Sequence, residues 1–282
     1  MAAHLVKLAC ELPDKVGRSL SLWTCAELAR TLREDGIVKS ISPQTVQRIL
    51  SSHKLKPWRV HHWLSPKVPR DEAFRQQVLN IENLYTRNLR ANERVLCFDE
   101  KTSLQPRTRT APTRPPRPGG APVLVEHEYE RKGALNLLAC IDTRSGRVTG
   151  ICRPRKRQEE FIELLEKIDR ETPRRVTRIH LIGDNVSVHK GRKVQEYLTK
   201  HPRFRMHFMP THCSWMNQIE QWFSILQRKR LIAPNFADLD ELERKLLDFI
   251  DEWNEIAQPF KWKSRSFMKI LNKCEAEILA AA

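Results

Sequence analysis

The sequence predicts a mixed α/β fold for most of the chain and an all-α domain at its N-terminal end. Three apolar segments with strand character lie close together, and the turn from Asp142 to Gly146 joins the last two as a hairpin. Helical and strand patterns then alternate, which is typical of a sheet with mixed strand directions and flanking helices. Up to about residue 66, in contrast, apolar residues repeat at the spacing of short helices.

Residues 1–66 are predicted to form a helix-turn-helix DNA-binding domain. Thr24 and Glu27 form a capping box at the start of one helix, and a second helix begins with Ser42 as N-cap and Pro43 in its first turn. The outward side of the second helix is polar or cationic, which suits a helix that reads DNA; the alternative is an ordinary helical pair with a solvated face. The predicted DNA-contacting residues are Gln44, Thr45, Gln47, Arg48, Lys54, Lys56 and Arg59, and the basic tail extends through His61, His62 and Lys67.

A helical linker is predicted for residues 67–92, and an α/β domain with C-terminal helices for residues 93–282. The linker helix has Phe74, Val78, Ile81 and Tyr85 along one side. Residues 105–122 contain arginines and prolines but no acid, which predicts an extended basic arm or, alternatively, a disordered insertion. Strands are predicted near 95–98, 123–130, 134–142, 147–152, 177–183 and 205–209, and helices near 157–171, 190–200, 215–230, 238–254 and 264–280.

The composition points to a polyanionic partner. The formal net charge of +16 favours nucleic acid first and an anionic membrane surface second. The seven cysteines include no C-x-x-C pair, which favours free thiols in a reducing compartment over disulfides or zinc. No apolar run approaches the roughly 18 residues of a membrane span, so a cytoplasmic protein associated with the nucleoid is expected. Lys101, Arg153, Arg155, Lys156 and Arg157 are predicted to contact the phosphate backbone.

Three carboxylates are the strongest candidates for a site. Asp99 follows the apolar run 95–98 and Asp184 follows the run 179–183, so both are expected at the carboxyl ends of buried strands. Glu220 is predicted on the polar flank of a helix, beside its apolar stripe, and can therefore face the same cleft. Such an all-oxygen pocket suits a hard divalent cation and metal-assisted cutting of phosphodiesters.

Two polar neighbours extend this prediction. Asn217 lies one helical turn before Glu220 and could orient a water or a phosphate. Glu100 is expected to point to the opposite face of the sheet from Asp99, because side chains alternate along a strand. The alternative for each acid taken singly is a solvated surface position, where most carboxylates are found.

These residues resemble the three conserved blocks of DDE transposases. The blocks here are Phe98-Asp99-Glu100, Gly183-Asp184-Asn185 with His189, and Asn217-Gln-Ile-Glu220 with Trp222. The chain is most similar to the mariner-like superfamily and, within it, to the bacterial insertion-sequence 630 family, because 35 residues separate Asp184 from Glu220. The resemblance covers roughly residues 20 to 255.

The resemblance implies an RNase H-like fold and a site with two Mg²⁺ ions, for which Mn²⁺ can substitute. Asp99, Asp184 and Glu220 would be the catalytic metal ligands, with Asn185, His189 and Asn217 as supporting residues. It further implies cleavage of double-stranded DNA at the terminal inverted repeats of a transposon and strand transfer into a TA dinucleotide. A homodimer on paired ends, with no membrane partner, is expected.

The chain departs from the family pattern in two respects. The family usually has two N-terminal helix-turn-helix units, whereas this chain has room for one. Prolines often stand in the third block where Trp215 and Gln218 are found here. The rival functions are an inactive remnant that acts as a DNA-binding repressor, another RNase H-like nuclease such as a resolvase or integrase, and a structural or membrane-surface protein.

Overall fold

The computed structural model describes residues 1–60, 71–120, 122–211, 213–232, 234–262, 267–268 and 271–272. The chain divides into two compact units, Met1–Lys67 and Val68–Ala282. His61, His62 and Lys67, and most of the helix expected over 264–280, lie outside the described residues. Every helix within the described ranges is too short or too polar to cross a membrane.

The first unit packs short helices around a small apolar core. The elements are α1 (Ala2–Cys10), the 3₁₀ helix η1 (Pro13–Val16), α2 (Cys25–Glu34) and α3 (Pro43–Ser52). Both predicted N-caps are confirmed. The hydroxyl of Thr24 accepts a hydrogen bond from the amide of Glu27, and that of Ser42 accepts one from the amide of Thr45, each at 3.1 Å.

Helix α1 was not predicted from the sequence. No side chain caps its N-terminus, so the local signal that marks α2 and α3 is missing. Leu5 and Leu8 are instead buried in the core that α2 and α3 build with Trp23. Tertiary packing of one apolar face therefore stabilises this helix, as is usual for helices of this length.

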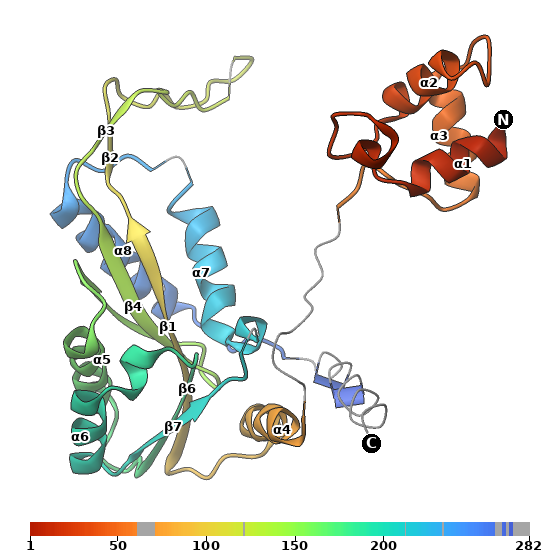
Figure 1. The fold of residues 1–282 in the computed structure, drawn as a ribbon. Helices are drawn as coiled ribbons and strands as arrows, with labels where there is room; N and C mark the ends of the chain where they lie inside the picture. Colours follow the sequence, from red (N-terminus) through yellow and green to blue (C-terminus); the bar gives the residue numbers. More distant parts are fainter. Residues whose placement is uncertain are drawn as a thin grey trace. The chain divides into compact units, whose positions relative to one another are not determined.

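A five-stranded mixed sheet forms the centre of the second unit (Figure 1). Its strand order is β5-β4-β1-β6-β7. β4 runs antiparallel to both β1 and β5, whereas β6 runs parallel to β1 and β7. This arrangement confirms the predicted mixed sheet. The strands are β1 (Glu93–Leu104), β4 (Leu135–Asp142), β5 (Val148–Arg153), β6 (Arg178–Gly183) and β7 (Phe204–Phe208).

The strand predicted near 123–130 does not join this sheet. Only β3 (Tyr129–Arg131) forms there, and it pairs with β2 (Arg107–Arg109) as a separate two-stranded ribbon. The guanidinium groups of three arginines contact the Tyr129 ring at 4.8 to 5.9 Å from its centroid: Arg107, Arg109 and Arg131. Within the predicted basic arm, residues 107–109 pair with β3 and Arg114 forms an isolated bridge with Leu124. Cation–π contacts with Tyr129 contribute to the pairing of β2 with β3.

Helices cover both faces of the main sheet (Figure 1). Val95 and Cys97 of β1 share one core with apolar residues of α4, α7 and α8, whereas Leu96 and Phe98 share a second core with α5 and α6. The predicted linker helix, α4, is therefore packed against the sheet. The helices are α4 (Glu72–Thr86), α5 (Gln158–Glu171), α6 (Arg192–Lys200), α7 (Gln218–Lys229) and α8 (Leu239–Glu255), with 3₁₀ turns η2 (Ser187–Lys190) and η3 (Ser214–Met216).

Candidate active site

Asp99 and Asp184 lie at the place where the parallel pairing of β1 and β6 stops. The last register pair between these strands is Cys97 with Ile182, and each aspartate follows two residues later. Asp184 comes directly after β6, as predicted. Asp99 does not end its strand, because β1 continues to Leu104 through its pairing with β4. The apolar run 95–98 therefore ends where the pairing of β1 with β6 ends, and not where β1 itself ends.

Asn217 connects Asp99 to the helix that carries Glu220. Its side chain is completely buried, and its Nδ2 donates to the carbonyl of Phe98 at 2.8 Å and to Oδ2 of Asp99 at 3.1 Å. Asn217 is the N-cap residue of α7, so Glu220 lies in the first turn of that helix. This nitrogen already holds Asp99, whereas the Oδ1 atom of Asn217 is buried without a hydrogen-bond partner among the described residues, so the use of Asn217 to orient a water or phosphate stays a prediction.

The charges of Glu220 and Asp184 both reach Asp99. Burial raises the pKa of Asp99 to about 7, and the negative charges of Glu100, Glu220 and Asp184 act in the same direction. A hydrogen bond from the Glu100 amide to Oδ1 of Asp99, at 2.8 Å, opposes this rise. Asp99, Asp184 and Glu220, which we call the acid cluster, therefore share one electrostatic neighbourhood.

His189 lies between Asp184 and Glu100. Its Nε2 is 2.8 Å from Oε1 of Glu100, and its Nδ1 is 3.0 Å from Oδ1 of Asp184. The Nδ1–H bond does not point straight at the Asp184 oxygen, so that contact is an ion pair more than a well-formed hydrogen bond. Burial disfavours a charged imidazole, but the two adjacent carboxylates outweigh it and raise the pKa of His189 to about 9.

Glu100 is the site residue that sequence reasoning undervalued. The prediction that Glu100 and Asp99 point to opposite faces of the sheet was correct, since Asp99 contacts Asn217 of α7 while Glu100 contacts His189 of η2. What it missed is that η2 brings His189 back to meet Glu100 beside Asp184. The signal available in the sequence was that Glu100 and His189 both belong to the blocks that resemble the family. Asn185, the remaining supporting residue, is exposed after β6.

The donor types of the acid cluster fit a hard divalent cation, but its side chains do not form a closed ligand set. A half-buried carboxylate with like-charged neighbours is costly to ionise, and a bound cation would relieve that cost. Among the described residues, no three His, Cys, Asp or Glu side chains stand where they could jointly hold a metal ion. Holding one would therefore require side-chain rotations that bring the carboxylate oxygens together.

Two lysines lie beside the acid cluster. Burial lowers the pKa of Lys101, and the charge of Glu220 opposes that shift. Burial also disfavours a charged Asp184, but His189, the amide of Val186 and the charge of Lys156 together lower its pKa. Lys101 and Lys156, both predicted to contact phosphates, are thus near enough to the acids to act on their charge.

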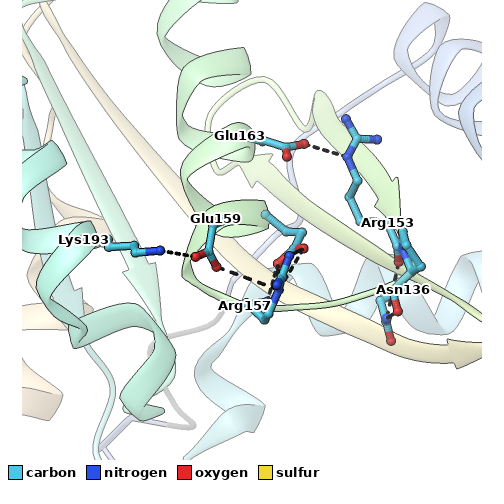
Figure 2. Close-up of polar contacts among 8 residues, drawn as sticks. Asn136, Arg153, Arg157, Glu159, Glu163 and Lys193 are labelled. Carbon is cyan, nitrogen blue, oxygen red and sulfur yellow. Dashed lines mark hydrogen bonds and ion pairs between the residues drawn. The ribbon is translucent and has the colours of Figure 1, made fainter.

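Arg153 and Arg157 are instead engaged within the chain (Figure 2). Arg153 donates to Glu163 at 2.6 Å, and Arg157 donates to Glu160 at 2.7 Å. Glu159 pairs with Lys193 and lies 3.8 Å from Arg157. Carboxylates of α5 already compensate the charge of these two arginines, and their contact with phosphates stays a prediction. Arg155, between them, is exposed.

The predicted DNA-contacting side chains of the first unit are on its surface. Gln44, Gln47 and Arg48 are exposed on α3, whereas Thr45 is half-buried, and its amide and hydroxyl both bond to Ser42. Past this helix the basic residues Lys54, Lys56 and Arg59 are exposed as well. The structure thus leaves one polar and cationic side of α3 open to a partner.

Comparisons with known proteins identify the family. A family model described as DDE superfamily endonuclease matches residues 94–243. The insertion element IS630 uncharacterized 39 kDa protein of Shigella sonnei is 27% identical over 134 residues, 48% of this chain and 38% of that protein. The chain thus matches well under half of the length of that relative.

Solved structures of the Mos1 transposase are similar in fold. The Mos1 mariner paired end complex with Mn aligns with a TM-score of 0.52 at 18% identity, over 99% of this chain and 78% of that one. A pre-cleavage Mos1 transpososome aligns with a TM-score of 0.50 at 15% identity, over the same shares. These matches confirm the expected RNase H-like fold. Because the family model spans more than half of the sequence, the chain belongs to the DDE superfamily endonucleases.

Proposed function

We propose that this chain is a transposase that cuts double-stranded DNA at terminal inverted repeats and joins the ends to TA target DNA. The observation that carries the proposal is the acid cluster, in which two strands and the first turn of α7 place three acids in one neighbourhood. A DDE endonuclease family match and the likeness to an insertion-element protein support it. The Mos1 structures concern paired transposon ends, which supports a homodimer acting on two ends.

Asp99, Asp184 and Glu220 would hold Mg²⁺ or Mn²⁺, two ions by the family resemblance. When bound, the metal supplies Lewis-acid activation of the attacking oxygen and charge compensation at the leaving oxygen. Asn217 and the Glu100 amide hold the Asp99 carboxylate from two sides, and His189 holds Asp184. These contacts limit how far either carboxylate must move to reach a shared ligand.

The chain's cations would bring the DNA backbone to the acid cluster. Lys101 and Lys156 lie beside its acids, where a scissile phosphate would need positive charge. The exposed residues of α3 would bind the repeats, and the net charge of +16 would favour the encounter with DNA in the cytoplasm. Recognition and cutting would thus be divided between the two units.

A cleavage assay tests the proposal. The substrate is a duplex that carries the inverted repeats flanking the coding sequence, incubated with the full chain and Mg²⁺ or Mn²⁺. We expect metal-dependent nicks at the repeat ends and strand-transfer products at TA, and loss of both in Asp184→Asn with DNA binding retained. Metal-dependent nicking that persists in Asp184→Asn contradicts the proposed site. Nicks without joined products favour an RNase H-like nuclease of another kind.

A DNA-binding repressor without cleavage is the second candidate. The open arrangement of the acid cluster over the described residues is the observation that favours it. In the same assay this protein would shift the repeat-containing duplex on a gel and give no product with either metal. If the protein is a repressor, the unaltered chain should bind the repeats without cutting them, and Asp184→Asn should bind them equally well.

A further inference from the structure

His189 is held in one plane by aromatic rings. Only 1% of this residue is exposed, although it lies on η2 next to the half-buried Asp184. Its ring meets Phe98 edge-on at a centroid distance of 4.9 Å and Phe161 at 4.6 Å. Because both phenyl rings belong to the apolar core under α5, the imidazole cannot turn freely. The directions of its two nitrogens are therefore fixed by packing.

Both nitrogens lie beside carboxylates, although the Nδ1–H bond is not aimed straight at Oδ1 of Asp184. Nε2 meets Oε1 of Glu100 at 2.8 Å, and Nδ1 meets Oδ1 of Asp184 at 3.0 Å. A carboxylate can only accept, so this arrangement calls for a hydrogen on each nitrogen. His189 thus connects an acid of the cluster to an acid that lies outside it.

The Asp184 carboxylate is held through one oxygen only. Oδ1 faces His189 and also accepts a long hydrogen bond, 3.4 Å, from the amide of Val186. No contact to Oδ2 is found within the described part of the chain. Fixing Oδ1 therefore sets the direction of an oxygen that is left available for a ligand.

Glu100 has no comparable task in the fold. Its side chain is only 12% exposed, and placing a carboxylate there is costly unless a partner compensates it. A backbone carbonyl or a neutral side chain would satisfy the imidazole at a lower cost. The length of Glu100 is what lets β1 reach across to Nε2 of His189 on η2.

We propose that Glu100 is a positioning residue that orients Asp184 through His189 for binding a divalent cation. This inference rests on the proposed metal site. Residues that hold a metal ligand from behind typically change metal affinity 10- to 100-fold when altered. The reach of the Glu100 side chain to Nε2, and not its negative charge, is the property that matters.

Two substitutions separate reach from charge. Glu100→Gln keeps the length, and its amide can accept from or donate to Nε2. Glu100→Asp keeps the charge and withdraws the carboxylate by one methylene. The readout is the dissociation constant for Mn²⁺ alone, measured by isothermal titration calorimetry on the full chain without DNA. Thermal unfolding in EDTA confirms that each variant is folded.

We expect Glu100→Asp to bind Mn²⁺ at least about tenfold more weakly and Glu100→Gln to stay within about threefold of the unaltered chain. Glu163→Gln and Glu163→Asp are the matched controls, because Glu163 is an acid of α5 that pairs with Arg153 away from His189. Both should match the unaltered chain. The same order should appear in the rate of metal-dependent cleavage at limiting Mn²⁺.

Other outcomes overturn the inference. Weak binding by Glu100→Gln with normal binding by Glu100→Asp would show that Glu100 acts through charge or as a ligand itself. Equal affinities in both variants, whether normal or weakened, would show that reach is irrelevant. Asp184→Asn distinguishes this failure from failure of the metal site: if it binds Mn²⁺ as tightly as the unaltered chain, the proposed function is what fails.

Discussion

Two groups of acids in the second unit have opposite electrostatic surroundings. On α5, Glu159, Glu160 and Glu163 each meet a lysine or arginine, and we call this group the α5 ladder (Figure 2). A hydrogen bond from Arg157 lowers the pKa of Glu160 to about 2. In the acid cluster, burial and like charges raise the pKa of Asp99 to about 7.

The contrast separates structural acids from candidate catalytic acids. Among the residues that the structure describes, no lysine or arginine forms an ion pair with Asp99 or Glu220. Each acid of the α5 ladder thus has a basic partner, whereas in the acid cluster only Asp184 is paired, with His189, and Asp99 and Glu220 have no ion-pair partner among the described residues. Perturbed, unbalanced acids of this kind are typical of functional sites.

The largest expected effect is on cleavage. Asp99→Asn can keep the hydrogen bond from Asn217 at its one carbonyl oxygen, but it loses the bond from the Glu100 amide and removes a predicted metal ligand. Lost charge stabilisation of several kcal/mol corresponds to roughly a thousandfold slower cutting. The rate of nicking of repeat-containing DNA at saturating Mg²⁺ measures it. Glu159→Gln, in the α5 ladder, should cut at the normal rate, and a similar loss in both variants would erase the distinction between the two groups.

The second expected effect is on stability, and it compares a glycine packed beside the acid cluster with one packed beside the α5 ladder. A Cβ at Gly183, before Asp184, would lie 2.2 Å from the ring of Phe98, which is buried beside His189. Gly183→Ala should therefore overpack the core and lower the free energy of unfolding by about 1–3 kcal/mol. Urea denaturation of the full chain measures this difference.

Gly191 is the matched position beside the α5 ladder. A Cβ there would lie 2.1 Å from Oε1 of Gln158, a flexible side chain that bonds to the amide of Lys193. Gly191→Ala should displace the Gln158 side chain from the Lys193 amide. It should lower the free energy of unfolding by about 1 kcal/mol, the usual effect of a lost cap. If Gly191→Ala is as damaging as Gly183→Ala, the acid cluster is not the more rigidly enclosed region.

A smaller expected effect is the pH dependence of the stability that the α5 ladder contributes. The pKa of Glu160 is lowered in the folded protein, so its ion pair with Arg157 stabilises the fold above the ordinary carboxyl pKa of 4.5 and is lost as the pH falls towards 2. Glu160→Gln should therefore be less stable than the unaltered chain at pH 7 and equal to it near pH 2. Thermal unfolding at both values checks this. A deficit that persists near pH 2 would mean that packing, not charge, is what Glu160 contributes.

The smallest expected effect is on DNA affinity. Lys156→Ala removes an exposed cation beside Asp184, whereas Arg153→Ala removes one that Glu163 already compensates. Lys156→Ala should weaken binding a few-fold and reduce the salt dependence by about one phosphate contact, with Arg153→Ala near normal. Titrations of duplex DNA at several salt concentrations measure both slopes. The reverse order would show that the α5 ladder opens to receive DNA.

Local patterns predicted the parts of the fold that depend on few residues. Thr24 and Ser42 marked their helices correctly because a cap acts over three residues. The strand expected near 123–130 was wrong in its bounds and its partner, because β3 pairs with β2, which lies about twenty residues earlier in the chain. Helix α1 was missed because its apolar face has meaning only against α2 and α3.

The acid cluster was predictable in outline but its supports were not. Apolar runs before Asp99 and Asp184 indicated neighbouring strands, and the helical stripe beside Glu220 indicated a third contributor. Whether Arg153 is free depends on Glu163 of the helix that follows, which spacing alone does not decide. The contact of Glu100 with His189 likewise depends on how η2 folds back after β6.

The bond pattern of Asn217 has a mechanical consequence for the acid cluster. One residue anchors α7 to the backbone of β1 and to Asp99, and the same helix carries Glu220 a single turn later. Asn217 therefore fixes the start of α7, with Glu220 one turn later, against β1 at Asp99, whereas His189 contacts Asp184. Since β1 and β6 pair directly, the sheet sets the distance between Asp99 and Asp184, and a small tilt of α7 would move Glu220 relative to both. A substitution far along that helix can therefore alter the acid cluster without replacing any of its acids.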